Sequence, residues 1–131
     1  MIKTKSVATK TDRQKDGLRI LIARGRGRGL PASHYDLWMA NLGPSEKLLG
    51  SYLAGKMSWD QYAQRYIREL RESDLLDRRN RNIRNHGQKF TLRLLQYLGT
   101  HQNVTLLCHC AEDERLCHRH VLQDLLSRPI K

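Results

Sequence analysis

Apolar residues alternate or run together in three short segments of the chain, which predicts three strands. These segments are residues 1–7, 18–24 and 104–108. The middle segment has apolar residues on both of its faces: Leu18, Ile20 and Ile22 on one, and Leu21 and Ala23 on the other. Strands with two apolar faces are typical of a parallel sheet in an α/β protein.

Apolar residues at helical spacing predict five helices between and after these strands. The clearest runs from Ser58 to about Glu72, where Ser58 and Gln61 form a capping box. Its apolar stripe recurs at i, i+3, i+4, i+7, i+8 and i+11: Trp59, Tyr62, Ala63, Tyr66, Ile67 and Leu70. The other four are expected over residues 33–42, from a Ser45 cap to before Gly55, over residues 90–98 ending at Gly99, and over residues 116–126.

This order of elements predicts one small α/β domain over residues 1–131, with a short, mostly parallel sheet flanked by helices. Leu, Ile, Val and Phe make up about 24% of the chain, which is enough for a modest core. No apolar run approaches the roughly 20 residues of a membrane span, and residues 1–15 lack the apolar stretch of a signal peptide. We therefore expect a cytoplasmic protein without a membrane partner.

The chain has a formal net charge of +11, and this excess is concentrated in two blocks. Residues 1–28 hold nine Lys/Arg and two acidic residues, and residues 78–103 hold six basic residues and no acid. Within the second block, residues 78–89 are expected to be an exposed basic segment. Such blocks favour an anionic partner, a nucleotide or nucleic acid, or else they are simply solvated faces. No base-reading motif accompanies them, so sequence-specific recognition is not expected.

The first block ends in a loop in which arginine alternates with glycine from Arg24 to Gly29. A run with glycine at every second position does not form a regular element at low cost. Because this loop follows a strand, Arg24, Arg26 and Arg28 are candidate anion-binding residues at the strand ends.

All three cysteines and three of the six histidines fall within residues 108–120. Cys108, Cys110, Cys117 and His120 are chemically available zinc ligands, although the Cys-x-Cys spacing is tighter than usual. Without a metal, Cys108 continues an apolar run and would be a buried thiol. Cys110 is also a candidate nucleophile, although the acidic residues that follow it would raise its pKa and repel phosphate.

Glu112, His118 and Arg119 complete this cluster. His118 and Arg119 begin a helix, where the macrodipole disfavours a cation unless an anion faces it. That anion would be either a bound ligand or the Glu112 carboxylate, so Arg119 is either an anion-binding residue or a partner of Glu112. Glu112 and His118 are the candidate acid/base residues if the protein is an enzyme.

Several motifs occur in a fixed order along the chain: Gly17-Leu18-Arg19-Ile20-Leu21-Ile22-Ala23-Arg24, Arg28-Gly29, Leu42-Gly43-Pro44-Ser45, Thr105-Leu106-Leu107-Cys108, Glu112 and Cys117-His118-Arg119. In these motifs the chain resembles the bacterial and archaeal domain of unknown function 488 family over nearly its whole length. The chain departs from the family at Gly25-Arg26-Gly27, where the family has an aromatic-proline pair. Either Cys108 or Cys110 fits the family's first cysteine. The resemblance implies an α/β fold and a site built from Arg24, Arg28, Glu112, Cys117, His118 and Arg119, but no reaction.

Together these patterns predict a pocket for an anionic, nucleotide-like or nucleic-acid group at the strand ends, and an enzyme that acts on nucleotides or nucleic acid is one interpretation of it. The alternatives are a non-catalytic nucleic-acid-binding module and a small domain with a structural zinc. Because parallel strands bring their carboxyl ends together, the loop of residues 24–29 should lie beside residues 108–120.

Overall fold

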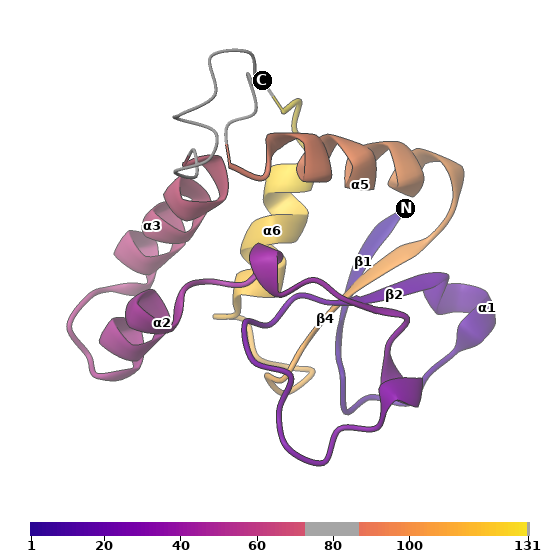
Figure 1. Cartoon of the computed structure of the whole chain (residues 1–131), viewed down its shortest axis with the longest axis horizontal. Coiled ribbons are helices and arrows are strands. Elements are labelled where there is room, and N and C mark those ends of the chain that lie inside the picture. The colour runs from indigo at the N-terminus through magenta and orange to yellow at the C-terminus, as the bar shows by residue number, and fades with distance from the viewer. Residues whose placement is uncertain (73–86, 131) are drawn as a thin grey trace.

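A computed structural model describes residues 1–72 and 87–130 of the chain (Figure 1). Within these residues, four parallel strands form one sheet in the order β1-β4-β2-β3. The strands are β1 (Ile2–Ser6), β2 (Leu18–Leu21), β3 (Leu37–Trp38) and β4 (Val104–Cys108). The predicted α/β fold with a parallel sheet is confirmed.

The helices are α1 (Arg13–Asp16), α2 (Glu46–Leu53), α3 (Trp59–Arg71), α5 (Lys89–His101) and α6 (His118–Leu126). The Ser58–Gln61 capping box at the start of α3 is present with both of its hydrogen bonds, and the Ser45 side chain caps α2. These local signals therefore predicted α2 and α3 correctly.

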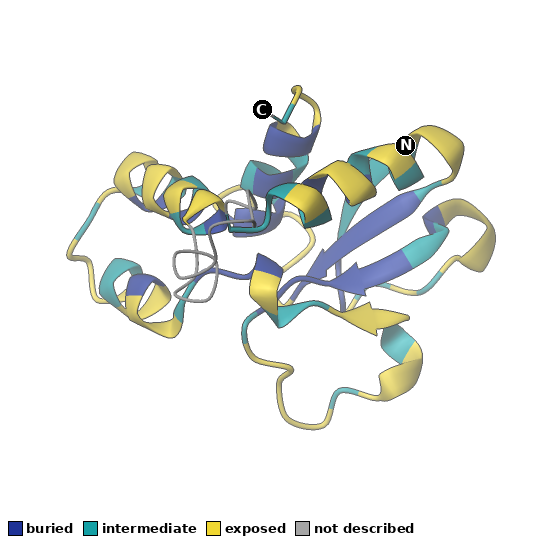
Figure 2. Ribbon diagram, turned by 45° about the horizontal axis from the view of Figure 1, so that its top comes forward, coloured by how far each residue is buried: buried dark blue, intermediate teal, exposed yellow. Residues whose placement is uncertain are grey.

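The central strand β4 is buried along its whole length, between β1 and β2. Helices α5 and α6 contact the sheet on one face, with α3 packed against α6 (Figure 2). Ile20, Val104 and Leu106 face these helices, whereas Leu21 and Leu107 belong to a smaller apolar cluster on the other face. The alternation predicted for β2 is thus correct, and both of its faces are covered.

Residues 33–42 do not form the predicted helix. They form two 3₁₀ turns, Ala32–His34 and Ala40–Leu42, with the short strand β3 between them. The Asp36 carboxylate accepts a hydrogen bond from the Arg19 backbone N–H at 2.8 Å. The Asp36 N–H donates in turn to the Arg19 carbonyl, so pairing with β2 outweighs the weak local helix signal.

The other two helix boundaries also differ from the prediction. Helix α5 continues through Gly99 to His101, because Gly99 is the point at which the helix packs closely against β1. A Cβ atom at Gly99 would lie 2.6 Å from the Ile2 side chain. Helix α6 begins at His118, with Cys117 as the N-cap residue, rather than at Leu116.

Most of the predicted basic segment, residues 78–86, lies outside the described residues. None of the described helices has the length and apolarity that a membrane span requires.

A buried ion cluster ties α1 to the sheet. Asp16 is 4% exposed and forms ion pairs with Arg19, itself 3% exposed, and with Lys5. Burial raises the pKa of the Asp16 carboxyl, but the Asp12 backbone N–H, Lys5 and Arg19 more than offset this and hold it below its ordinary value. The ionised carboxylate therefore stabilises the fold.

Replacing this carboxylate should destabilise the protein in a pH-dependent way. The depressed pKa means that the stability it contributes is fully present above its unfolded pKa of about 3.9 and is lost as the pH falls through the lower folded value. We expect Asp16→Asn to lower the free energy of unfolding by about 3 to 5 kcal/mol near neutral pH, because it leaves Arg19 unpaired in the core.

Urea unfolding at a series of pH values measures this effect. The difference in the free energy of unfolding between the parent and Asp16→Asn should become smaller below pH of about 4. Asp124→Asn is the matched control, because Asp124 pairs with Arg128 on the surface and should contribute less than about 1 kcal/mol. Equal losses in the two variants would contradict this role for Asp16.

Candidate functional site

The carboxyl ends of β1, β4 and β2 meet at one edge of the sheet, and the loops that follow them contact one another. His109, directly after β4, makes a 3.0 Å hydrogen bond through Nε2 to the Gly25 carbonyl oxygen. His118 Nε2 lies 2.8 Å from the carbonyl oxygen of Ile22, which directly follows β2. The predicted contact between the loop of residues 24–29 and the segment of residues 108–120 is confirmed.

The three thiols gather at the end of β4. Cys108 Sγ lies 3.3 Å from Cys117 Sγ and 3.7 Å from Cys110 Sγ. Cys108 and Cys117 are buried, and Cys110 is partly exposed. Cys108 is the last residue of β4, Cys110 lies in the loop that follows it, and Cys117 meets Cys108 from the N-terminus of α6.

His118 belongs to this thiol cluster. Its Nδ1 lies 3.8 Å from Cys108 Sγ, and the edge of its ring packs against Tyr66 with the ring centroids 5.5 Å apart. Because Nε2 donates to the Ile22 carbonyl, the unprotonated nitrogen of the neutral ring is Nδ1, which faces the sulfur. His118 is only 6% exposed, so its geometry does not support the acid/base role expected of it toward a substrate in solvent.

The cluster makes Cys108, and not Cys110, the more acidic thiol. A hydrogen bond from the Cys117 thiol holds the pKa of Cys108 well below its ordinary value despite its burial. Burial raises the pKa of Cys110, and donation to Cys108 raises that of Cys117. The structure thus gives no support to an activated Cys110 nucleophile.

His120 does not take part in the cluster. Its Nε2 lies 3.0 Å from the Glu114 carbonyl oxygen, on the far side of the helix start. The group of candidate ligand atoms that lie within 4.8 Å of one another comes from Cys108, Cys117 and His118. Two members of the predicted ligand set, Cys110 and His120, lie outside this group, and His118 lies in it because the N-cap geometry of Cys117 turns the next residue toward the sulfurs.

Arg119 is completely buried and holds the loop after β4 in place. Its guanidinium donates to three successive backbone carbonyls: Cys110 at 3.3 Å, Ala111 at 2.9 Å and Glu112 at 3.0 Å. Its donors are directed at the loop, and its Nη2 also lies 3.7 Å from Glu112 Oε2. Of the two expected roles, the geometry therefore favours pairing with Glu112 over contact with a bound anion.

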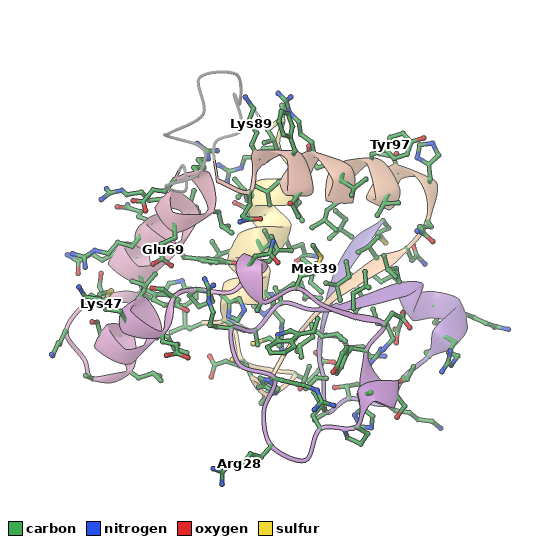
Figure 3. The ribbon with its side chains drawn as sticks, viewed as in Figure 1. Arg28, Met39, Lys47, Glu69, Lys89 and Tyr97 are labelled. Atoms are coloured by element: carbon green, nitrogen blue, oxygen red, sulfur yellow. The ribbon has the colours of Figure 1, made fainter. Side chains whose placement is uncertain are left out.

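The arginines of the loop after β2 differ in their surroundings. Arg24 donates to the carbonyls of Gly43 and Pro44, so it too holds the backbone. Arg26 is exposed, with its guanidinium bonded to the Tyr35 hydroxyl and the Leu30 carbonyl. Arg28 is exposed and its side chain extends away from the tip of the loop (Figure 3). Of the three predicted anion-binding residues, Arg26 and Arg28 are accessible.

Glu112 is a half-exposed carboxylate with a fixed position. Its Oε2 accepts a hydrogen bond from the Ser6 backbone N–H at 3.2 Å and lies 3.7 Å from Arg119 Nη2. It also lines a groove of about 300 Å³ whose other charged residues are three lysines and two aspartates: Lys3, Lys5, Lys15, Asp12 and Asp16. Sequence reasoning selected Glu112 but missed Ser6 and this groove, because a backbone donor and a groove between distant segments leave no local signal.

His109 is a further residue that the sequence did not single out. It is exposed, and its ring covers Gly27, whose φ is 84°; a Cβ atom there would lie 2.9 Å from His109 Cε1. Gly27 allows this close approach because it has no Cβ atom. The arginine–glycine alternation was the available signal, but the partner of the glycine could not be identified from it.

Removal of the Arg119 guanidinium should destabilise the fold strongly. Arg119→Ala leaves three buried or partly buried carbonyls without a charged donor, so we expect a loss of at least about 3 kcal/mol in the free energy of unfolding. Arg115→Ala removes an exposed arginine from the same loop and should cost less than about 0.5 kcal/mol. Thermal and urea unfolding compare the two variants. An Arg119→Ala protein as stable as the parent would refute the role of Arg119 in holding the loop after β4.

Comparisons with known proteins identify the family but no named relative. No curated protein and no solved structure matches the chain. One family model, DUF488-N3a, described as the active DUF488-N3 subclade, matches residues 2–129. The chain therefore belongs to the DUF488 family, within this subclade.

Proposed function

We propose that the protein binds nucleic acid through phosphate contacts across the carboxyl edge of the sheet, and that Glu112 is the acid/base residue of an enzyme acting on that ligand. The observation that carries this proposal is that a positioned, half-exposed carboxylate shares one sheet edge with an exposed arginine loop. Open α/β sheets place their ligand sites at this edge.

The arrangement of the basic residues favours an extended polyanion over a single nucleotide. A nucleotide pocket needs several donors that converge on one phosphate, yet Arg24 and Arg119 donate to backbone carbonyls instead. The accessible cations are spread out, from Arg26 and Arg28 on one side to Lys3 and Lys15 in the groove beside Glu112 on the other, where Lys5 is already paired with Asp16. Spread cations match the regular spacing of phosphates along a strand.

Glu112 gives the edge a group that phosphate binding alone does not require. A carboxylate repels phosphate, so in a simple binding surface it would weaken the interaction. Here the Ser6 backbone N–H fixes the Glu112 carboxylate through Oε2, and Arg119 holds the surrounding loop in place. A fixed and accessible carboxylate is suited to proton transfer, and the description of the subclade as active supports a catalytic role.

The alternative is a non-catalytic nucleic-acid-binding module. The same charge distribution favours it, since two basic blocks supply phosphate contacts without any chemistry. The role of Glu112 separates the two: in a binding module its neutralisation affects affinity alone, whereas in an enzyme it abolishes turnover.

Binding should depend on Arg28 and on salt. We expect Arg28→Glu to weaken binding to DNA and RNA oligonucleotides of every sequence, and to make the slope of log affinity against log salt shallower by about 1 or more. Lys47→Glu is the matched charge reversal, on α2 and away from the loop of Arg28 (Figure 3). Fluorescence anisotropy measures both, and affinity that is independent of salt, or reduced equally by the two variants, would refute this surface.

Turnover should depend on Glu112. After incubation of the protein with nucleotides and oligonucleotides, mass spectrometry reveals any product, and we expect Glu112→Gln to lower its rate of formation at least about 100-fold. Binding by this variant should be unchanged or tighter, because a repelling charge is removed. Asp113→Asn, in the same exposed loop, is the control and should retain the rate. Product formation that survives in Glu112→Gln would exclude the acid/base role, and binding without any product would favour the module.

A further inference from the structure

The thiol cluster is chemically unlike the apolar core around it. Three sulfur atoms and an imidazole nitrogen converge beside Tyr66, at the junction of β4 and α6. Apolar side chains would fill this space without any polar atom, so packing does not require this set of residues. It is, however, the set of donor atoms that binds zinc in closed protein sites.

The separations from Cys108 Sγ match the edges of a tetrahedral metal site. Zinc–sulfur bonds of about 2.3 Å give tetrahedron edges of about 3.8 Å between sulfurs, and the edges to a nitrogen are slightly shorter. The observed separations from Cys108 Sγ are 3.3 Å to Cys117 Sγ, 3.7 Å to Cys110 Sγ and 3.8 Å to His118 Nδ1. Ligand atoms of Cys108, Cys117 and His118 all lie within 4.8 Å of one another, whereas Cys110 lies outside this group, so its partly exposed side chain would have to turn toward the other ligands to complete the tetrahedron.

The second nitrogen of His118 supplies an independent observation. Histidine ligands of metals almost always donate their other ring N–H to a carbonyl or carboxylate, which fixes the tautomer and the ring orientation. The Ile22 carbonyl, 2.8 Å from His118 Nε2, fulfils this role. The lone pair of Nδ1 is thereby directed toward Cys108 Sγ.

We propose that Cys108, Cys110, Cys117 and His118 form a Cys₃His zinc site. Binding releases the thiol protons, and three thiolates with one Zn²⁺ leave the site with a net charge of −1. This charge lies at the N-terminus of α6, where the helix macrodipole stabilises an anion, with the buried Arg119 guanidinium in the same turn. The charge of the loaded site is thus compensated by its surroundings.

With four protein ligands the site is closed, and its role is structural. The ion would join the end of β4 to the start of α6, and through the Ile22 carbonyl it would also fix the residue that follows β2. The loops bearing Arg28 and Glu112 both start from this point. The zinc site does not depend on the proposed nucleic-acid function, and metal content is measured separately from binding.

Zinc content tests the site directly. Protein expressed without a histidine tag and passed through a desalting column should contain about one zinc per chain by elemental analysis. Cobalt(II) added to chelator-treated protein should give the intense visible bands of a tetrahedral thiolate complex. Cys117→Ser should abolish the bound zinc and lower the melting temperature of the protein as isolated.

Matched histidine variants identify the fourth ligand. His118→Ala should lose zinc or bind it far more weakly, whereas His120→Ala and His109→Ala should retain it, because neither side chain joins the cluster. Should a ligand variant fail to fold, cobalt titration of the parent protein still decides whether tetrahedral thiolate ligation occurs.

Three results would overturn the proposal. One is a folded parent protein with no zinc and no cobalt spectrum. Another is a Cys108–Cys117 disulfide, seen as a loss of two protons by mass spectrometry, in a protein that binds no metal after reduction. The third is zinc retained by Cys117→Ser and lost from His120→Ala, which would place an adventitious ion on the surface.

Discussion

The buried guanidinium of Arg119 is the interaction on which the carboxyl edge of the sheet depends. The loop after β4 carries Cys110 and Glu112, and it has no regular secondary structure to satisfy its carbonyls. Arg119 supplies charged donors to three of these carbonyls from within the first turn of α6. The cost of burying a cation is offset by this set of hydrogen bonds, and the loop is held in one conformation. Both Glu112 and the thiol cluster derive their positions from this loop.

Local signals predicted much of the fold, and long-range pairing accounts for what they missed. The capping box of α3 and the two apolar faces of β2 are encoded within a few residues, so they could be identified from spacing alone. Residues 33–42 have a weak helix signal, and pairing of Asp36 and Met39 with β2 overrides it. Gly99 would be expected to end a helix, yet its contact with Ile2, nearly one hundred residues away in sequence, keeps it inside one.

In the candidate site, the sequence predicted which residues lie together better than it predicted what each of them does. Clustering of cysteine, histidine and arginine located the site at the correct edge, because parallel strands align their carboxyl ends. Roles were harder to predict, since they depend on burial and on backbone partners. Arg24 and Arg119 donate to backbone carbonyls. Whether His118 or His120 contacts the sulfurs depends on where helix α6 begins, because Cys117 is its N-cap residue.

The strand order also governs how the chain acquires its structure. β4 lies between β1 and β2, so the first two strands cannot pair with each other in the native sheet. Their common partner begins at Val104, which leaves a ribosome-bound chain without its sheet until most of it has been synthesised. Closing such long loops in parallel registers makes folding slow and leaves apolar strands uncovered meanwhile. The lysines on β1, at positions 3 and 5, reduce the tendency of that waiting strand to pair with another chain.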